Sequence, residues 1–442
     1  MNQFNVSLWG DEAFSAILSM KSIPEIIKII TRDTSPPLYN ITEHIAFQLF
    51  GTGEVVVRGL SFFYYLIAIF FVYKIGEFLW DRRTGAIVAF LSFFNPFFFI
   101  YAFEGRMYSI LAMGVAASMY FFTRIIFSPK KISSLNWYGY IIFSLVAMYS
   151  HHFAGFALLV QGLWVTWVFL FGKRKVAITM FKAFIFIGVL YLPWVLPLIN
   201  QIRMVGGGFW LGTPTVNDLL GLIRDYLGEG VKHMFALPSV VLVFSILFLR
   251  RWNKNPKKSI FLASWFLIPI LATWGVSQIF QSIFFNRYLL YTIPAAMLLV
   301  ASERRKFSAA PIIMLMGFFV IISTFYFFNP TKDPFNNLAE YVRENKRGDD
   351  FIIHGDPGNH QLWESKYYGI SAPIYTPQSK DLPFFVGTAL MEDTDIITTL
   401  PPKVRRIGVI TPHEVDAAFL PNYTKGEAVA FGNLRLTWFV RK

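Results

Sequence analysis

The sequence predicts an all-α bundle of membrane-spanning helices that carries a small α/β domain at its C-terminal end. Three observations lead to this fold class. The 442 residues are 55% hydrophobic and 18% aromatic, and 15% are charged, whereas a soluble domain carries about 25% charge. Apolar stretches of membrane length recur from residue 55 to residue 329. Residues 330–442 instead mix short helix and strand patterns.

These patterns divide the chain into a first extracytoplasmic loop (1–54), a helical bundle (55–329) and an extracytoplasmic α/β domain (330–442). The first loop has no run of ~20 apolar residues, so it has no spanning helix. Ser22 and Glu25 fit a capping box, and Pro24 suits a first turn. We expect a short helix there, either in the membrane interface or packed on the bundle.

About ten spans are expected in the bundle, and two of them are short for a bilayer ~30 Å thick. They cover residues 57–79, 84–102, 107–127, 136–151, 153–171, 177–199, 235–250, 259–280, 287–302 and 308–328.

The loops between these spans alternate in charge. One set holds 16 cations: Arg82, Arg83, Arg124, Lys130, Lys131, Lys173, Arg174, Lys175, Arg250, Arg251, Lys254, Lys257, Lys258, Arg304, Arg305 and Lys306. The opposite set holds five: Arg106, Arg203, Arg224, Lys232 and Arg287. The positive-inside rule makes the first set cytoplasmic. Residues 1–54, the loop 200–234 and the C-terminal domain are therefore expected outside the cytoplasm of a plasma-membrane protein.

The net charge of +13 does not indicate nucleic-acid binding. Residues 330–442 hold 13 Lys and Arg against 14 Asp and Glu, so the basic excess lies in the membrane part. The chain has no cysteine, which excludes disulfides. In the C-terminal domain we expect a helix over 337–346, strands over 350–354 and 406–411, and a hairpin within 427–440 that turns at Gly432-Asn433.

The first candidate residues are the acids of the predicted outer loop. Asp11 and Glu12 could accept a proton from a hydroxyl or hold a metal, and the ordinary alternative is a helix cap or a solvated acid. Asp33 precedes Pro36-Pro37, which fixes an extended backbone. Glu104 and Arg106 lie at the start of the third span, where they could pair, and Arg106 could bind phosphate.

His151 and His152 occupy a tight turn between two spans, where they could serve a metal, a polar substrate or the structure alone. Arg287 and Tyr288 open the ninth span, where Arg287 could snorkel or bind an anionic headgroup. Pro294 lies within that expected span and could kink it.

With these motifs in place, the chain resembles the GT-C superfamily of membrane glycosyltransferases. It is most similar to the bacterial branch of the dolichyl-phosphate-mannose protein mannosyltransferase family, which includes the lipid A aminoarabinose transferases. The residues that carry the resemblance are Trp9-Gly10-Asp11-Glu12-Ala13-Phe14, Asp33, Pro36-Pro37-Leu38-Tyr39, Gly51-Thr52-Gly53-Glu54, Arg58, Ser61, Asn95-Pro96, Glu104-Gly105-Arg106-Met107-Tyr108, Arg287-Tyr288 and Pro294.

The resemblance implies transfer of a sugar from a polyprenyl-phosphate donor on the outer face, with Asp11 as the base. Two features depart from the family. Relatives usually have a spanning helix before the Asp-Glu loop, so either residues 1–54 translocate as a tail or an upstream helix is missing. Some relatives also have histidine where this chain has Ser35.

The residues agree with that chemistry. A phosphate leaving group is already acidic, so one base and cations for the departing phosphate suffice. We expect Asp11 as base and Arg106, Arg287 and Tyr288 at the donor phosphate. Glu12, Asp33, Glu104, His151 and His152 are expected to support them. Direct attack would invert the sugar.

The acceptor is a protein, lipid or glycan hydroxyl. The sequence indicates no particular cofactor, and a divalent metal stays open. A transporter of lipid-linked sugars or small anions is the alternative function, and a non-catalytic envelope assembly protein or sensor is the third. A transporter should show inverted repeats and charged or broken helices at mid-membrane. Here the helix interiors are nearly free of charge.

Overall fold

A computed structural model describes residues 2–128, 132–231, 233–248, 256–302, 309–356, 358, 360–378 and 381–442. Several cations used in the charge argument lie outside the described residues: Lys130, Lys131, Lys232, Arg250, Arg251, Lys254, Arg304, Arg305 and Lys306. The chain forms two compact units. One unit holds residues 1–33, 40–57 and 329–442, and the other holds residues 34–39 and 58–328.

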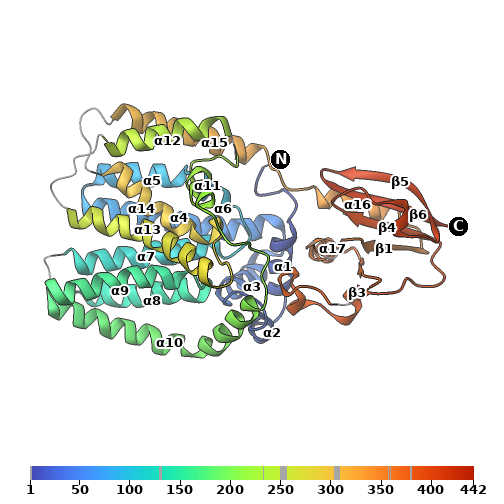
Figure 1. Cartoon of the computed structure of the whole chain (residues 1–442), viewed down its shortest axis with the longest axis horizontal. Coiled ribbons are helices and arrows are strands. Elements are labelled where there is room, and N and C mark those ends of the chain that lie inside the picture. The colour runs from blue at the N-terminus through green and yellow to red at the C-terminus, as the bar shows by residue number, and fades with distance from the viewer. Residues whose placement is uncertain are drawn as a thin grey trace. The chain divides into compact units, whose positions relative to one another are not determined.

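The second unit is a bundle of helices, which we call the helical unit. Its helices are α4 (Glu54–Leu79, from residue 58), α5 (Arg82–Phe93), α6 (Pro96–Tyr101), α7 (Tyr108–Ile126), α8 (Ser134–Ser150), α9 (Ala154–Phe171), α10 (Arg174–Gly206), α11 (Val216–Tyr226), α12 (His233–Phe248), α13 (Pro256–Ile279), η1 (Asn286–Thr292), α14 (Ile293–Ala301) and α15 (Ala309–Phe328). Figure 1 shows α7, α8, α9 and α10 running side by side.

Six described helices are long and apolar enough to cross a membrane: α4, α7, α9, α10, α13 and α15. Their outer faces are apolar as well. On α10, for example, Ile185, Leu192 and Leu196 are all exposed. Soluble proteins rarely expose large continuous apolar surfaces, so these faces suit contact with lipid. The structure therefore supports a polytopic membrane bundle, and six of the ten expected spans meet these criteria.

The expected span 84–102 is two helices, because Asn95-Pro96 interrupts it. The Asn95 side chain accepts a hydrogen bond from the Phe98 amide at 3.0 Å, which caps α6. Its amide nitrogen donates to the Tyr226 carbonyl at 2.8 Å and so ties α6 to α11. Pro96 occupies the first turn of α6, where a missing N–H costs nothing.

The expected span 287–302 also begins differently from the prediction. Residues 286–292 form the 3₁₀ helix η1, and α14 starts at Ile293. Pro294 therefore lies in the first turn of α14 and does not kink a longer helix, as proline is tolerated at that position.

The first unit joins the N-terminal segment to the C-terminal domain, and we call it the mixed unit. Its helices are α1 (Gly10–Ser19), α2 (Ile23–Ile30), α3 (Leu38–Phe50, from residue 40), α16 (Phe335–Asn345) and α17 (Gln361–Tyr367). Its strands are β1 (Asp350–His354), β2 (Ile374–Tyr375), β3 (Ile396–Ile397), β4 (Arg406–Thr411), β5 (Tyr423–Phe431) and β6 (Leu434–Arg441).

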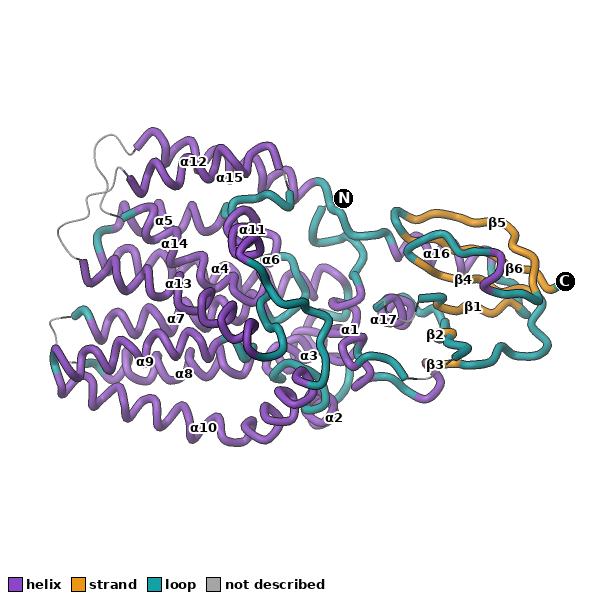
Figure 2. The backbone as a smooth tube through the Cα atoms, viewed as in Figure 1, coloured by secondary structure: helices purple, strands orange, loops and turns teal. Residues whose placement is uncertain are grey.

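The six strands form one sheet in the order β3-β2-β1-β4-β6-β5 (Figure 2). The first four are parallel, and β6 joins β4 and β5 in antiparallel pairs. Apolar clusters cover both faces, one around Phe335, Leu338 and Ile352, the other around Ile353, Val409 and Phe439. The helix near 337–346, both predicted strands and the hairpin turn at Gly432-Asn433 are confirmed.

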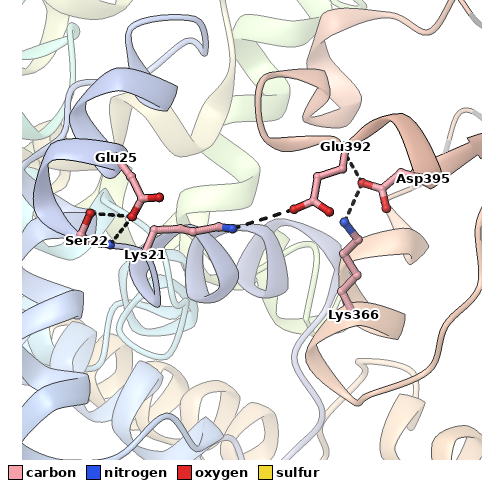
Figure 3. Close-up of polar contacts among 6 residues, drawn as sticks. All are labelled: Lys21, Ser22, Glu25, Lys366, Glu392 and Asp395. Atoms are coloured by element: carbon pink, nitrogen blue, oxygen red, sulfur yellow. Dashed lines mark hydrogen bonds and ion pairs between the residues drawn. The ribbon is translucent and has the colours of Figure 1, made fainter.

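Polar contacts link α1 and α2 to the C-terminal part of the mixed unit (Figure 3). Lys21, between α1 and α2, lies 4.0 Å from Glu392. The Glu392 amide donates to Asp395, which also pairs with Lys366 at 2.6 Å. The predicted start of α2 is confirmed, since Glu25 accepts a hydrogen bond from the Ser22 amide at 3.0 Å.

Candidate functional site

In the helical unit, Glu104 and Arg106 lie in the short turn between α6 and α7. Glu104 is buried and Arg106 is half-buried. The Arg106 amide donates to the Glu104 carbonyl at 2.7 Å, and the Ser109 hydroxyl donates to the Tyr101 carbonyl at 2.8 Å. One backbone and one side-chain hydrogen bond thus hold the turn between α6 and α7.

Arg287 lies in η1 with its guanidinium over three aromatic rings. Its central carbon is 4.6 Å from the Phe285 ring centroid, 5.6 Å from that of Tyr108 and 6.0 Å from that of Tyr288. Cation–π contact favours this placement. A guanidinium stacked on rings keeps its planar fork of donors, which matches the geometry of a phosphate.

His151 packs against aromatic neighbours of both predicted arginines. Its ring lies 4.8 Å from that of Tyr288, next to Arg287, and 6.4 Å from that of Tyr108, two residues after Arg106. The His151 Nδ1 atom accepts a hydrogen bond from the Phe153 amide at 3.2 Å. The structure therefore brings Arg106, His151, Arg287 and Tyr288 together at one end of α7 and α9.

Glu104 belongs to the same surroundings. Tyr101 interacts electrostatically with Arg287, Glu104, Asp225 and Tyr288. Glu104, predicted as a supporting residue, therefore lies in the neighbourhood of Arg287, although the two are 183 positions apart in the sequence.

His152 has partners of its own, which sequence analysis missed. Its Nε2 atom lies 2.7 Å from the Gln201 side-chain oxygen, and its Nδ1 atom lies 3.4 Å from the Tyr191 hydroxyl. Gln201 also donates to the Ser35 carbonyl at 3.3 Å. His152 therefore connects α9 to α10 and to the segment before Pro36. Nothing in the sequence pairs Gln201 with a histidine 49 residues earlier.

Asp225 in α11 is a second residue that sequence analysis missed. The Asn286 amide, next to Arg287, donates to its carboxylate. Partial burial raises the pKa of Asp225, and the hydrogen bond from Asn286 opposes this rise. Asp225 lies in the loop 200–234, so this loop reaches the residue next to Arg287.

In the mixed unit, Asp11 and Glu12 occupy the first turn of α1, where acids interact favourably with the helix dipole. Glu12 accepts a hydrogen bond from the Trp9 amide at 3.4 Å, which matches the alternative of a helix cap for these acids. Glu12 also pairs with Lys332 at 2.9 Å and is fully buried. The structure therefore gives Glu12 a role in holding α1.

Asp11 faces a histidine from the C-terminal region. Its Oδ1 atom lies 3.6 Å from Nδ1 of His360, and the two side chains are 13% and 27% exposed. This contact brings together residues 349 positions apart, so no local sequence signal could have found it. Asp33 is buried, at the end of the turn after α2.

Glu364 is a further buried carboxyl of the mixed unit. Burial raises its pKa well above the ordinary 4.5, and the charges of Asp333 and Glu12 raise it further. It lies in α17, the helix that begins just after His360. Among the described residues, no group of three or more His, Asp or Glu side chains is arranged to hold a metal ion.

The comparisons with known proteins agree with this fold. Residues 34–200 match the dolichyl-phosphate-mannose-protein mannosyltransferase family. The crystal structure of ArnT from Cupriavidus metallidurans in the apo state superposes with a TM-score of 0.65 at 13% identity, covering 99% of this chain and 95% of that one. ArnT bound to undecaprenyl phosphate gives 0.63 at 12% identity, covering 99% and 94%.

A more distant likeness is to the archaeal oligosaccharyltransferase AglB from Archaeoglobus fulgidus, in complex with an inhibitory peptide and a dolichol-phosphate. Its TM-score is 0.50 at 12% identity, covering 92% of this chain and 66% of that one. No curated protein matches the chain in sequence.

The fold and the six apolar helices together indicate a polytopic membrane protein with a fold similar to that of ArnT. Residues 34–200 match the dolichyl-phosphate-mannose-protein mannosyltransferase family in sequence. The resemblance drawn from the sequence is confirmed.

Proposed function

We propose that this protein is a glycosyltransferase that moves a hexose-type sugar from a polyprenyl-phosphate donor to a hydroxyl acceptor on the outer face of the membrane. The observation that carries the proposal is the Arg287 guanidinium stacked on Tyr108 and Tyr288, with Arg106 in the turn just before Tyr108. Two arginines in one neighbourhood suit a dianionic phosphate. The likeness to ArnT bound to undecaprenyl phosphate supports the same donor class.

The proposed reaction is a direct displacement. Asp11 takes the proton of the acceptor hydroxyl while that oxygen forms a bond to the anomeric carbon. The bond from the anomeric carbon to the phosphate oxygen breaks, and its electron pair leaves with the polyprenyl phosphate. Arg106, Arg287 and Tyr288 stabilise the departing charge. A single displacement inverts the anomeric centre.

The proposal extends to topology. The four expected spans outside the set of six are α5 with α6, α8, α12, and η1 with α14, and we propose that these also cross the membrane. Residues 1–54 and 330–442 would then lie on the outer face. There the C-terminal domain and the loop 200–234 would select a protein, lipid or glycan acceptor.

The test is Asp11→Asn in the full-length protein, assayed with a labelled polyprenyl-phosphate sugar. We expect transfer to fall about 100-fold or more, because the acceptor loses its base, while polyprenyl phosphate still binds. Asp349→Asn, which changes an exposed acid of the same unit, is the control and should keep full activity. Full transfer by Asp11→Asn would show that Asp11 is not the base.

A further inference from the structure

The start of α1 and the residue before α17 approach too closely for any side chain at position 10. A Cβ atom on Gly10 would lie 2.1 Å from the His360 Cβ atom and 3.1 Å from its Cα atom. Glycine at this position therefore lets the two backbones meet. The next residue along α1 is Asp11, whose carboxylate faces the His360 ring at 3.6 Å.

A second close contact, one helical turn further on, fixes this approach. The Phe14 ring packs edge-on against Trp363, with centroids 5.3 Å apart and planes at 80°. Trp363 donates to the Val386 carbonyl at 2.9 Å. A Cβ atom on Gly387 would lie 2.8 Å from Trp363 Nε1 and 2.9 Å from the Phe14 ring. Because α17 is locked against α1, His360 is held beside Asp11.

Both side chains are partly exposed, Asp11 to 13% and His360 to 27%, whereas the His360 Nδ1 atom that faces Asp11 is buried. Their separation is longer than a hydrogen bond. Catalytic contacts are often long without substrate and tighten when it binds.

We propose that His360 is a positioning residue for Asp11, so that the C-terminal domain supplies part of the catalytic machinery and does not serve acceptor selection alone. The inference rests on the proposed role of Asp11 as base. The imidazole N–H holds one carboxylate oxygen, which aims the other at the acceptor hydroxyl. The acceptor proton goes to Asp11, and His360 gains none.

The first experiment measures the steady-state kinetics of full-length His360→Ala with a labelled polyprenyl-phosphate sugar. We expect kcat to fall about tenfold, which corresponds to about 1.4 kcal/mol. The donor KM should stay unchanged, because the donor phosphate is assigned to Arg106 and Arg287. His413→Ala, an exposed histidine of the same domain, is the matched control and should keep wild-type kinetics.

Two further variants separate positioning from packing. His360→Phe keeps the ring volume without an N–H donor, and His360→Gln keeps a donor. We expect the Phe variant to lose activity as the Ala variant does, and the Gln variant to recover most of it. If His360→Ala lowers the melting temperature, the comparison of the Phe and Gln variants decides between positioning and packing. Equal activity of those two variants would overturn the proposal.

A double-mutant cycle with Asp11→Asn gives the decisive readout. If His360 acts through Asp11, His360→Ala should not reduce the residual rate of Asp11→Asn any further. A further tenfold loss in that background would show that His360 acts independently, and the proposal would be wrong. Full activity of Asp11→Asn alone would instead contradict the assigned base, which is a different result.

Discussion

At the scale of single residues, Arg287 is placed by aromatic rings. Phe285, Tyr108 and Tyr288 lie within 6.0 Å of its guanidinium carbon, so the flat face of the group is packed. A lysine would keep the charge but lose both the stacking and the bidentate fork. The surroundings of Arg287 therefore favour arginine over lysine.

We expect Arg287→Lys to weaken binding of polyprenyl phosphate about tenfold, since one charge-assisted hydrogen bond contributes about 1.5–3 kcal/mol, and Arg287→Ala to weaken it more. Arg203→Lys, at an exposed site near the end of α10, should leave binding unchanged. The measurement is equilibrium binding of labelled polyprenyl phosphate to the purified protein. Equal binding by Arg287→Lys and the wild type would show that Arg287 does not bind the donor phosphate.

Glu364 predicts a dependence of stability on pH. Its folded-state pKa lies well above 4.5 because the carboxyl is buried, with Asp333 and Glu12 nearby. As the pH rises from about 4.5 toward that raised pKa, the unfolded chain loses this proton while the folded chain keeps it. Folding stability from this group is therefore complete below about 4.5 and falls as the pH rises.

Glu364→Gln should remove the fall in folding stability that Glu364 causes as the pH rises. We expect its melting temperature to depend less on pH between 5 and 8 than that of the wild type, and to be higher at the upper end of that range. Glu427→Gln, at an exposed position on β5, is the control. Parallel pH profiles for the wild type and Glu364→Gln would show that the folded carboxyl is not held neutral.

At the scale of elements, α1 is set in place by contacts that its own sequence does not specify. Gly387 has a φ of +91° and lies against Phe14 and Trp363. Gly369 has a φ of +76° with no atom within 4 Å of a Cβ atom. Both glycines adopt a left-handed backbone conformation. Only Gly387 also lacks room for a Cβ atom.

We expect Gly369→Ala to cost about 1–2 kcal/mol for the left-handed conformation, and Gly387→Ala to cost a further 1–3 kcal/mol or so from overlap with the two rings. Thermal or chemical unfolding of the full-length protein measures both. Similar losses for the two variants would mean that α1 and α17 can separate at little cost.

Elements with a strong local signal were predicted well. The Ser22 and Glu25 capping box starts α2, and Gly432 turns the last hairpin with a φ of +65°. The pattern over residues 84–102 was misjudged because its apolar run continues through Asn95-Pro96. A hydropathy pattern carries no information about a capping side chain that also binds a distant carbonyl. Asn95 is such a residue, since it donates to the Tyr226 carbonyl.

At the scale of the molecule, the mixed unit is closed by a contact between segments far apart in the sequence. Lys332 follows the last long apolar helix, and Glu12 lies in the first helix, yet their charged atoms are 2.9 Å apart. Glu12 is fully buried and Lys332 is 14% exposed at the side chain. Removing one partner leaves a buried charge, which is costly.

We expect Lys332→Met to destabilise the protein by about 3–5 kcal/mol and the double variant Lys332→Met with Glu12→Gln to recover most of this. Lys425→Met breaks the exposed pair with Glu414 and should cost less than about 1 kcal/mol. Melting temperatures of the three variants provide the comparison. A Lys332→Met protein as stable as Lys425→Met would show that the pair does not hold α1.

The sequence by itself determined the membrane bundle, the small α/β domain and the family likeness, because hydropathy, turn residues and motif order are local properties. Tertiary structure alone decided that Asp11 faces His360, that Arg287 stacks on Tyr108 close to Arg106, and that the first helix belongs with the C-terminal sheet. These contacts join residues that are far apart in the chain. Packing, and not the pattern around either partner, brings them together.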